Sequence, residues 1–261
     1  MPATDRLRRE QLFHDRQARS RAETYAAQPD RLRFRDADYL DHEAWVRPAF
    51  ARLGDLRDQP VLDLGCGHGM AAIVLARHGA VVTACDLSAG YVAEAGRRAR
   101  TNEADVSFVQ ADGHQLPFAA ESFAAVWGHA ILHHLDVPIA ARELWRVLRP
   151  GGLAVFCEPW GGNPLARLAR HWLPYSGKGH TADEEPLGPR QIRHLAAVFG
   201  PVDVDGFQVF GGLRRAWPRL GSVLDWADDR LLPAVPGLRR FGRYVVVTVR
   251  RGCRGPAASL I

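Results

Sequence analysis

A glycine-rich stretch at residues 61–69 has the spacing of a cofactor-binding loop. It reads Val-Leu-Asp-Leu-Gly-Cys-Gly-His-Gly, an apolar strand that runs into three closely spaced glycines. Glycine lets a backbone approach a ligand closely, and the N-terminus of the following helix offers free N–H groups to an anionic group. The alternative is a dinucleotide site, but its Gly-x-Gly-x-x-Gly/Ala pattern would place Met70 where a small residue is needed. The sequence therefore disfavours a dinucleotide.

Polar residues accompany this loop at the expected ends of successive strands. Asp63 lies in the strand before the loop, and Asp86 ends the next strand, where it can accept hydrogen bonds from ribose hydroxyls. Asp112 and Gly113 follow the third strand, where a carboxylate can meet an adenine amino group, and a turn at 127–129 follows the fourth. Singly, Asp86 or Asp112 would be read as a helix cap or turn former. Together they predict one nucleoside site, because open parallel sheets bind ligands at these strand ends.

Histidines and a carboxylate after the fourth and fifth strands are candidates for acid–base chemistry. His133 and His134 form a pair, and Glu158 ends the fifth strand; each can remove a proton from a hydroxyl or an acidic carbon. The alternative is that these side chains have a structural role, in which they pack against the next helix or cap it. His129 and His133 are four residues apart, but no third ligand is evident, so we predict no metal site.

The chain around these residues has the pattern of repeated βαβ units, in which short apolar runs alternate with amphipathic stretches. Strands are expected at 61–64, 81–85, 106–110, 123–127, 153–158, 202–210 and 244–249. Helices are expected at about 69–78, 88–101, 136–148, 165–172 and 189–199. Proline and paired glycines at 149–152 end the third of these helices. The last two strands suit an antiparallel hairpin that brackets an insertion.

Three parts of the chain are expected. Residues 1–58 are polar and helical in character, with aromatic side chains that could close over a ligand as a lid. A core follows at 59–250, with insertions on the substrate side at about 159–200 and 211–242, and residues 251–261 form a tail.

Five ordered motifs carry a resemblance to a known family. They are Val-Leu-Asp-Leu-Gly-Cys-Gly-His-Gly, Cys-Asp-Leu-Ser, Gln-Ala-Asp-Gly-His-Gln-Leu-Pro-Phe, Leu-His-His-Leu and Leu-Arg-Pro-Gly-Gly. The chain resembles the class I S-adenosylmethionine-dependent methyltransferases that act on small molecules, a group with quinone C-methyltransferases and sugar and antibiotic O-methyltransferases. The resemblance covers about residues 59–160. It implies an α/β, Rossmann-like, seven-stranded sheet in the order 3-2-1-4-5-7-6, with strand 7 antiparallel, helices on both faces and an added lid.

The resemblance also implies roles for individual residues, with S-adenosyl-L-methionine as cofactor and S-adenosyl-L-homocysteine as product. Gly65, Cys66 and Gly67 would line the methionine end, and Asp63 would orient the loop and the cofactor's amino group. Further cofactor contacts are expected from the ends of the next three strands, at Asp86, Leu87, Asp112, Gly113 and His129. The expected catalytic residues are His133, His134 and Glu158, which match positions assigned to substrate deprotonation in sugar O-methyltransferases.

The expected reaction is methyl transfer to a partly hydrophobic small molecule, at a hydroxyl oxygen with His/Glu general-base assistance, in secondary or lipid-linked metabolism. Transfer to carbon of a quinone-like or isoprenoid acceptor is an alternative. A cyclase or decarboxylase that binds the cofactor without transferring its methyl group is another.

Composition bears on partners and location. The chain has 261 residues, 24% of them charged, and a net charge of +5 carried almost entirely by arginines spread along the chain. None of the short arginine clusters forms a nucleic-acid motif, so no nucleic-acid partner is expected. The N-terminus lacks the apolar segment of a secretory signal, which predicts a cytoplasmic protein. Membrane-surface contact or a subunit interface at 211–242, and a homo-oligomer, stay open.

Overall fold

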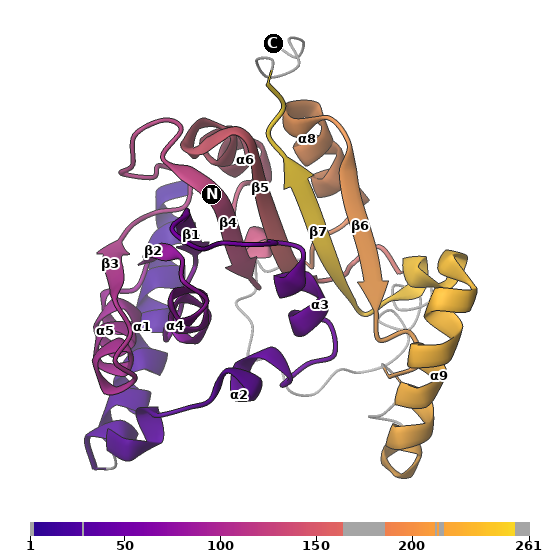
Figure 1. Cartoon of the computed structure of the whole chain (residues 1–261), viewed down its shortest axis with the longest axis horizontal. Helices are drawn as coiled ribbons and strands as arrows, with labels where there is room; N and C mark the ends of the chain where they lie inside the picture. The colour runs from indigo at the N-terminus through magenta and orange to yellow at the C-terminus, as the bar shows by residue number, and fades with distance from the viewer. Residues whose placement is uncertain (1–2, 28, 164–185, 212, 214–216, 254–261) are drawn as a thin grey trace.

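The computed structural model describes residues 3–27, 29–163, 186–211, 213 and 217–253. At its centre lies a seven-stranded sheet with the order β3-β2-β1-β4-β5-β7-β6 (Figure 1). Its strands are β1 Pro60–Leu64, β2 Val81–Asp86, β3 Val106–Gln110, β4 Phe123–His129, β5 Leu148–Pro159, β6 Val202–Phe207 and β7 Tyr244–Arg250. Strands β1 to β5 pair in parallel, and β7 runs antiparallel to both β5 and β6. The predicted fold class and strand order are confirmed.

Strands β4 and β5 extend further than predicted. β4 continues to His129, so residues 127–129 end the strand and do not form a turn after it. β5 begins at Leu148, so the segment 149–152 enters the strand. Two backbone hydrogen bonds to the end of β7 support this extension: the N–H of Gly151 donates to the carbonyl of Arg251, and the N–H of Arg251 donates to the carbonyl of Gly152, each at 2.8 Å.

Strand β6 is shorter than predicted and ends at Phe207. The next residue, Gln208, has a φ of +54°, a left-handed conformation that breaks the pleat. The helix expected at 165–172 lies outside the described residues.

Helices cover both faces of the sheet because successive residues of a buried strand point in opposite directions. Val61 belongs to the apolar cluster under α2 (Asp36–Leu40), α3 (Val46–Ala51) and α4 (Met70–Arg77). Its neighbour Leu62 belongs to the cluster under α6 (Val137–Val147) and α8 (Pro189–Phe199). α5 (Ala89–Thr101) packs against β2 and β3. The parallel strands therefore lie between two helical layers, and their carboxyl ends stay free to form a site.

A long N-terminal helix, α1 (Ala3–Ala27), packs along α5 (Figure 1). The hydroxyl of Ser88 donates to the Asp15 carboxylate at 2.5 Å, and the Tyr91 hydroxyl donates to the Gln17 side chain at 3.0 Å. The helices approach so closely that a Cβ on Gly90 would lie 2.8 Å from the Cβ of Ala18. These contacts hold α1 over the end of β2.

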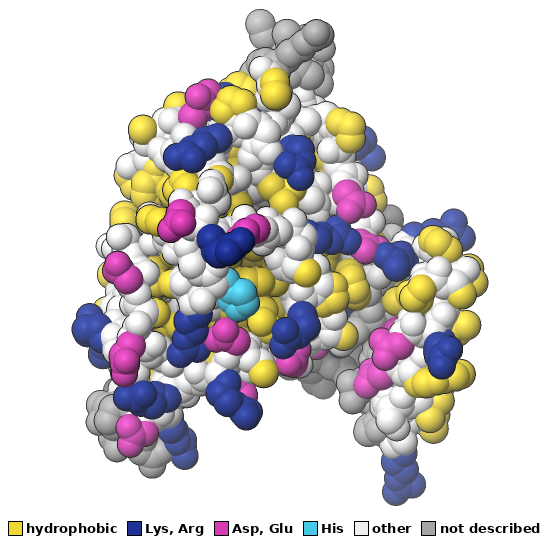
Figure 2. All heavy atoms as spheres, in the orientation of Figure 1, with side chains coloured by type: hydrophobic (Ala, Val, Ile, Leu, Met, Phe, Trp, Pro, Cys, Tyr) yellow, Lys and Arg dark blue, Asp and Glu magenta, His cyan; other side chains and the backbone are white. Residues whose placement is uncertain are grey.

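The segment between β6 and β7 contains α9 (Gly221–Ala234), which lies beyond the end of the sheet (Figure 1). Figure 2 shows acidic and basic side chains interspersed over the visible face, without a broad basic patch. Among the described helices, none is both long and apolar enough to cross a bilayer.

Candidate cofactor site

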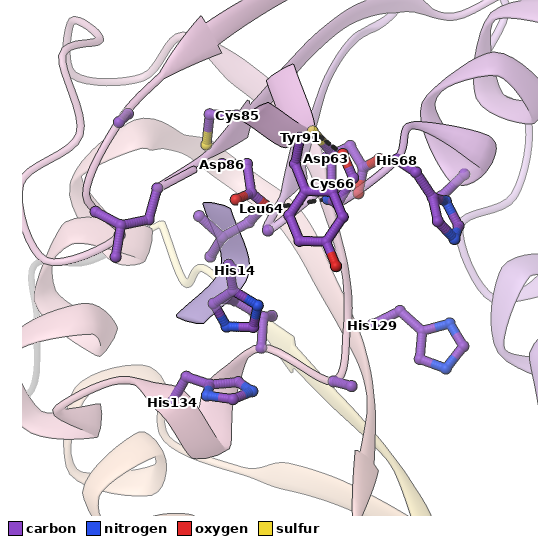
Figure 3. Close-up of a pocket in the computed structure, with 18 of the residues that line it drawn as sticks. His14, Asp63, Leu64, Cys66, His68, Cys85, Asp86, Tyr91, His129 and His134 are labelled. Carbon is purple, nitrogen blue, oxygen red and sulfur yellow. Dashed lines mark hydrogen bonds between the residues drawn. The ribbon is translucent and has the colours of Figure 1, made fainter. Parts of the chain in front are cut away.

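A cavity of about 290 Å³ lies at the carboxyl ends of β1, β2 and β4, with α1 above it. Its walls come from one face of α1, the end of α2, the glycine loop, the ends of β2, β3 and β4, the start of α5 and the segment after β4. The lining residues include Glu10, His14, Gln17, Tyr39, Asp63, Gly65, Cys66, Gly67, His68, Asp86, Leu87, Tyr91, Asp112, Gly113, His129 and His134. Figure 3 shows the labelled members of this set around the cavity.

The glycine loop takes a conformation that other residues would resist. Gly65, Gly67 and Gly69 have φ values of +69°, +49° and +83°, in the region that L-residues with a Cβ rarely adopt. The N–H groups of Gly65 and Cys66 both donate to the carbonyl of Cys85 at 2.9 Å, which fastens the loop to β2. Gly69 then begins α4. These hydrogen bonds hold the loop in one conformation, and the loop residues line the cavity.

Asp86 links this loop to the next helix. One carboxylate oxygen accepts a hydrogen bond from the N–H of Gly67 at 2.8 Å, and the other accepts one from the N–H of Ser88 at 2.9 Å. Burial raises the pKa of the Asp86 carboxyl above its usual value. Each oxygen keeps a second lone pair, so the fixed carboxylate can also accept hydrogen bonds from two vicinal hydroxyls, as a ribose presents them.

Asp63 brings a buried acceptor to the cavity. The residue is 1% exposed, and its Oδ2 atom has no hydrogen-bond partner among the residues that the structure describes. Burial, the largest cause, raises the pKa of this carboxyl to about 7. An unpaired buried acceptor costs free energy until a donor reaches it. A ligand ammonium group beside Oδ2 would supply that donor.

Asp112 is hydrogen-bonded by His114, whose ring tautomer is defined by its second hydrogen bond. The N–H of Asp136 donates to Nε2 of His114 at 2.8 Å, so the ring proton lies on Nδ1, which is 2.6 Å from Oδ1 of Asp112. The backbone N–H of His114 donates to the same oxygen. Although burial opposes it, these hydrogen bonds hold the pKa of Asp112 below its usual value. Asp112 therefore presents a negative charge beside Gly113 at this end of the cavity.

Glu158 and His133 form a buried pair behind the cavity wall. Glu158 is fully buried, and its Oε1 accepts hydrogen bonds from the N–H groups of Ile131 and Leu132, at 2.9 and 2.7 Å. Its Oε2 lies 2.7 Å from Nδ1 of His133. Neither Glu158 nor His133 lines the cavity. Glu158 thus fixes the turn that follows β4 and the ring of His133.

His134 is the member of the pair that faces the cavity. Its ring packs on His133 with centroids 4.1 Å apart, and it lies 5.6 Å from the ring of His14 on α1. Its Nδ1 atom is 3.5 Å from a carboxylate oxygen of Glu10, which is also on α1. An imidazole within reach of a bound ligand can accept a proton from it.

His129, at the end of β4, lies on another side of the cavity (Figure 3). Its Nδ1 is 3.4 Å from the hydroxyl of Tyr39, which in turn accepts a hydrogen bond from the indole N–H of Trp127 at 3.0 Å. Burial, followed by the nearby His42, lowers the pKa of His129 to about 4. His129 is therefore neutral at physiological pH and suited to hydrogen bonding with a ligand.

The structure brings the predicted cofactor residues to one cavity and separates the predicted catalytic ones. Asp63, Gly65, Cys66, Gly67, Asp86, Leu87, Asp112, Gly113 and His129 all line it. His134 lines it too, whereas His133 and Glu158 lie behind it. Sequence reasoning missed His68 and the α1 residues Glu10, His14 and Gln17. The spacing of Leu7, Glu10, His14 and Gln17, which puts them on one helical face, was the available signal.

Comparisons with known proteins agree with this geometry. Residues 62–156 match the Methyltransferase domain family. The demethylmenaquinone methyltransferase of Clavibacter sepedonicus is 43% identical over 83% of this chain and 85% of its own length. The malonyl-acyl-carrier-protein O-methyltransferase of Enterobacter lignolyticus is 35% identical over 61% of this chain. The matched part spans 59% of that relative, and 49% of the demethylmenaquinone methyltransferase of Beutenbergia cavernae.

Solved structures show the same fold. An S-adenosylmethionine-dependent methyltransferase from Mesorhizobium loti has a TM-score of 0.56 and 21% identity, and covers 81% of this chain and all of its own. The geranyl diphosphate C-methyltransferase of Streptomyces coelicolor A3(2) has a TM-score of 0.55 and 19% identity over 80% of this chain and 77% of its own.

The chain belongs to the class I S-adenosylmethionine-dependent methyltransferases. The cofactor of that class, S-adenosyl-L-methionine, suits the residues present, because the buried Oδ2 of Asp63 lacks the donor that the cofactor's ammonium group carries.

Proposed function

We propose that the protein transfers a methyl group from S-adenosyl-L-methionine to a small, partly hydrophobic acceptor, with His134 as general base. The observation that carries the proposal is that His134, unlike its neighbour His133, lines the same cavity as the glycine loop, Asp63, Asp86 and Asp112. In this assignment Asp86 accepts from the ribose, Asp112 and Gly113 hold the adenine, and Gly65, Cys66, Gly67 and His129 surround the methionine end.

The residues of the chain mainly align the reactants, which is the chief requirement of an in-line displacement. The bound cofactor supplies a methyl group on a positively charged sulfur. His134 would accept the proton that the acceptor hydroxyl loses, which would leave an electron pair on that oxygen for the incoming methyl group. Glu158 acts through His133, whose ring packs on His134. It is a positioning residue in this scheme.

The acceptor class that we favour is a quinol or another phenol-like ring. Loss of a proton from such a hydroxyl makes both the oxygen and the adjacent ring carbons nucleophilic, so His134 would serve as the base for either outcome. Transfer to carbon would be completed by loss of the ring C–H proton and return of a proton to the oxygen, which restores the aromatic hydroxyl. The relative from Clavibacter sepedonicus is named for action on demethylmenaquinone and matches over most of both chains, which supports methylation at carbon. Residues 1–58 would then form the cap of the site, and the segments 159–200 and 211–242 would form its acceptor side.

Turnover with a panel of acceptors tests the proposal. The purified protein, S-adenosyl-L-methionine and reduced 1,4-naphthoquinone, a simple phenol, an aliphatic alcohol or a malonyl thioester are incubated separately. Formation of S-adenosyl-L-homocysteine together with a methylated quinol or phenol is the expected result. A changed acceptor without S-adenosyl-L-homocysteine would favour a cyclase or decarboxylase. Failure to bind S-adenosyl-L-homocysteine in calorimetry would refute the whole proposal.

Cofactor affinity should depend on pH through Asp63. The pKa of its carboxyl in the free protein is about 7, and only the ionised form pairs with an ammonium group. As pH falls below this value, a proton must leave Asp63 before the ligand binds, so affinity weakens. The dissociation constant for S-adenosyl-L-homocysteine should rise about fivefold from pH 7 to pH 6, measured by calorimetry. Asp63→Asn should bind weakly at both values, and an unchanged pH response in that variant would contradict the assignment.

A further inference from the structure

His68 has a buried ring nitrogen for which neither the fold nor the proposed chemistry supplies a partner. Nδ1 of His68 is inaccessible to solvent and makes no hydrogen bond within the described part of the chain. The residue lines the cofactor cavity, between Gly67 and Gly69 of the loop. A buried polar atom without a partner is uncommon in a folded protein, because it has lost its hydrogen bonds to water. Oδ2 of Asp63, in the same cavity, is likewise buried and without a hydrogen-bond partner among the described residues.

The main chain of His68 is fixed from behind by charged residues. Nε of Arg98 donates to the carbonyl of His68 at 3.0 Å, and Arg98 is 3% exposed. The Glu94 carboxylate, fully buried, pairs at 3.0 Å with both Arg98 and Arg21 of α1. The backbone at His68 is therefore held in place, and its ring is directed by the loop conformation.

The same surroundings keep the His68 ring neutral while favouring an anion. Burial, followed by the charges of Arg21 and Arg98, lowers the pKa of His68 to about 4. A neutral imidazole carries one N–H donor and adds no charge. Glu94, which pairs with both guanidinium groups, acts in the opposite direction but more weakly than either arginine. The remaining positive field would attract a carboxylate placed beside His68. In Figure 3, His68 lies with His129 on one side of the cavity, away from His14 and His134.

We infer that His68 binds the α-carboxylate of the cofactor through Nδ1–H while Asp63 binds its α-ammonium group. This inference rests on the proposed function. The two ligand groups are attached to one carbon atom, and the two side chains belong to one strand–loop unit, five positions apart. An acceptor and a donor, both buried and both unpaired, match the two opposite charges of an amino-acid end. The protein thereby distinguishes the cofactor and its product from nucleosides that lack this end.

Calorimetry with three ligands tests the inference without any methyl acceptor. S-Adenosyl-L-homocysteine carries both groups, its decarboxylated analogue carries only the amine, and 5′-methylthioadenosine carries neither. The wild-type protein should bind S-adenosyl-L-homocysteine at least about tenfold more tightly than the decarboxylated analogue, the value of one charge-assisted hydrogen bond. Equal affinity for these two ligands would overturn the inference, and this comparison needs no variant to fold.

Variants at position 68 then assign the effect to this side chain. His68→Ala should lose about tenfold in affinity for S-adenosyl-L-homocysteine and keep its affinity for the other two ligands. His68→Asn should restore most of the loss, because its amide nitrogen can stand where Nδ1 stands. The control is His78→Ala, at the C-terminal end of α4, because its ring hydrogen-bonds the carbonyl of Val74 and the residue does not line the cofactor cavity. It should leave all three affinities unchanged.

The outcomes separate this inference from the proposed function. If His68→Ala binds S-adenosyl-L-homocysteine as tightly as the wild type, or weakens all three ligands equally, the carboxylate assignment is wrong while the cofactor site stands. If the wild-type protein binds none of the three ligands, the proposed function itself fails, and this inference fails with it.

Discussion

His134→Asn is expected to lower kcat by a factor of about 100 to 10,000, the usual contribution of a general base. The imidazole of His134 faces the cavity that holds the cofactor residues, and asparagine keeps a polar side chain there without a usable base. Binding of S-adenosyl-L-homocysteine should change little, because the assigned cofactor contacts are all elsewhere. Steady-state rates with the best acceptor of the panel, together with calorimetry, measure both quantities.

His133→Asn provides the matched comparison. His133 lies behind the cavity and contacts Glu158, so its loss should reduce kcat far less than the loss of His134. A larger loss in His133→Asn than in His134→Asn would reverse the assignment, and full activity in both would leave alignment alone as the source of catalysis.

Glu158→Ala should destabilise the protein by about 3 to 5 kcal/mol, because it leaves buried polar groups unpaired. The substitution removes the acceptor of the Ile131 and Leu132 N–H groups and of the His133 ring, all in contact with a fully buried carboxylate. It also leaves a cavity where the side chain was. Urea unfolding should show a lower midpoint with an unchanged m-value.

Glu158→Gln separates the charge from the hydrogen bonds. Its amide oxygen can still accept from the two backbone N–H groups, so we expect less than half of the stability loss seen with alanine. If Glu158→Ala unfolds at the wild-type urea concentration but has no turnover, Glu158 would be a catalytic residue and its structural role would be secondary.

Most of the fold could be predicted because its signals are local. Apolar runs such as 81–85 and 106–110 mark strands, and proline and glycine mark the ends of helices. The ends of the strands were harder to predict from the sequence. β5 begins at Leu148, five residues before the apolar run at 153, because hydrogen bonds to Arg251 at the end of β7 extend it. Such a pairing joins residues about a hundred positions apart and leaves no local pattern.

The same difference between local and long-range signals decided which residues of the site could be predicted. Asp63, Asp86 and Asp112 could be placed because each follows from the position of a strand. Which residue of the pair His133 and His134 reaches the cavity could not be, since it depends on the hydrogen bond that turns His133 toward Glu158. Glu10 and His14 were missed for another reason. They enter the site only because α1 docks on α5, and their spacing on one helical face does not show which part of the fold that face meets.

The contact between α1 and α5 also constrains how this sequence can vary. A Cβ at position 90 would come within 2.8 Å of the Cβ of Ala18, and Ala18 is itself 2% exposed. A larger side chain at either position would push α1 outward, and with it Glu10, His14 and Gln17, although neither position touches a ligand. Among homologues that keep this helix over the site, sizes at 18 and 90 should therefore covary, with one position small whenever the other is larger. This covariation would identify homologues in which α1 covers the site, even where the polar residues of α1 differ.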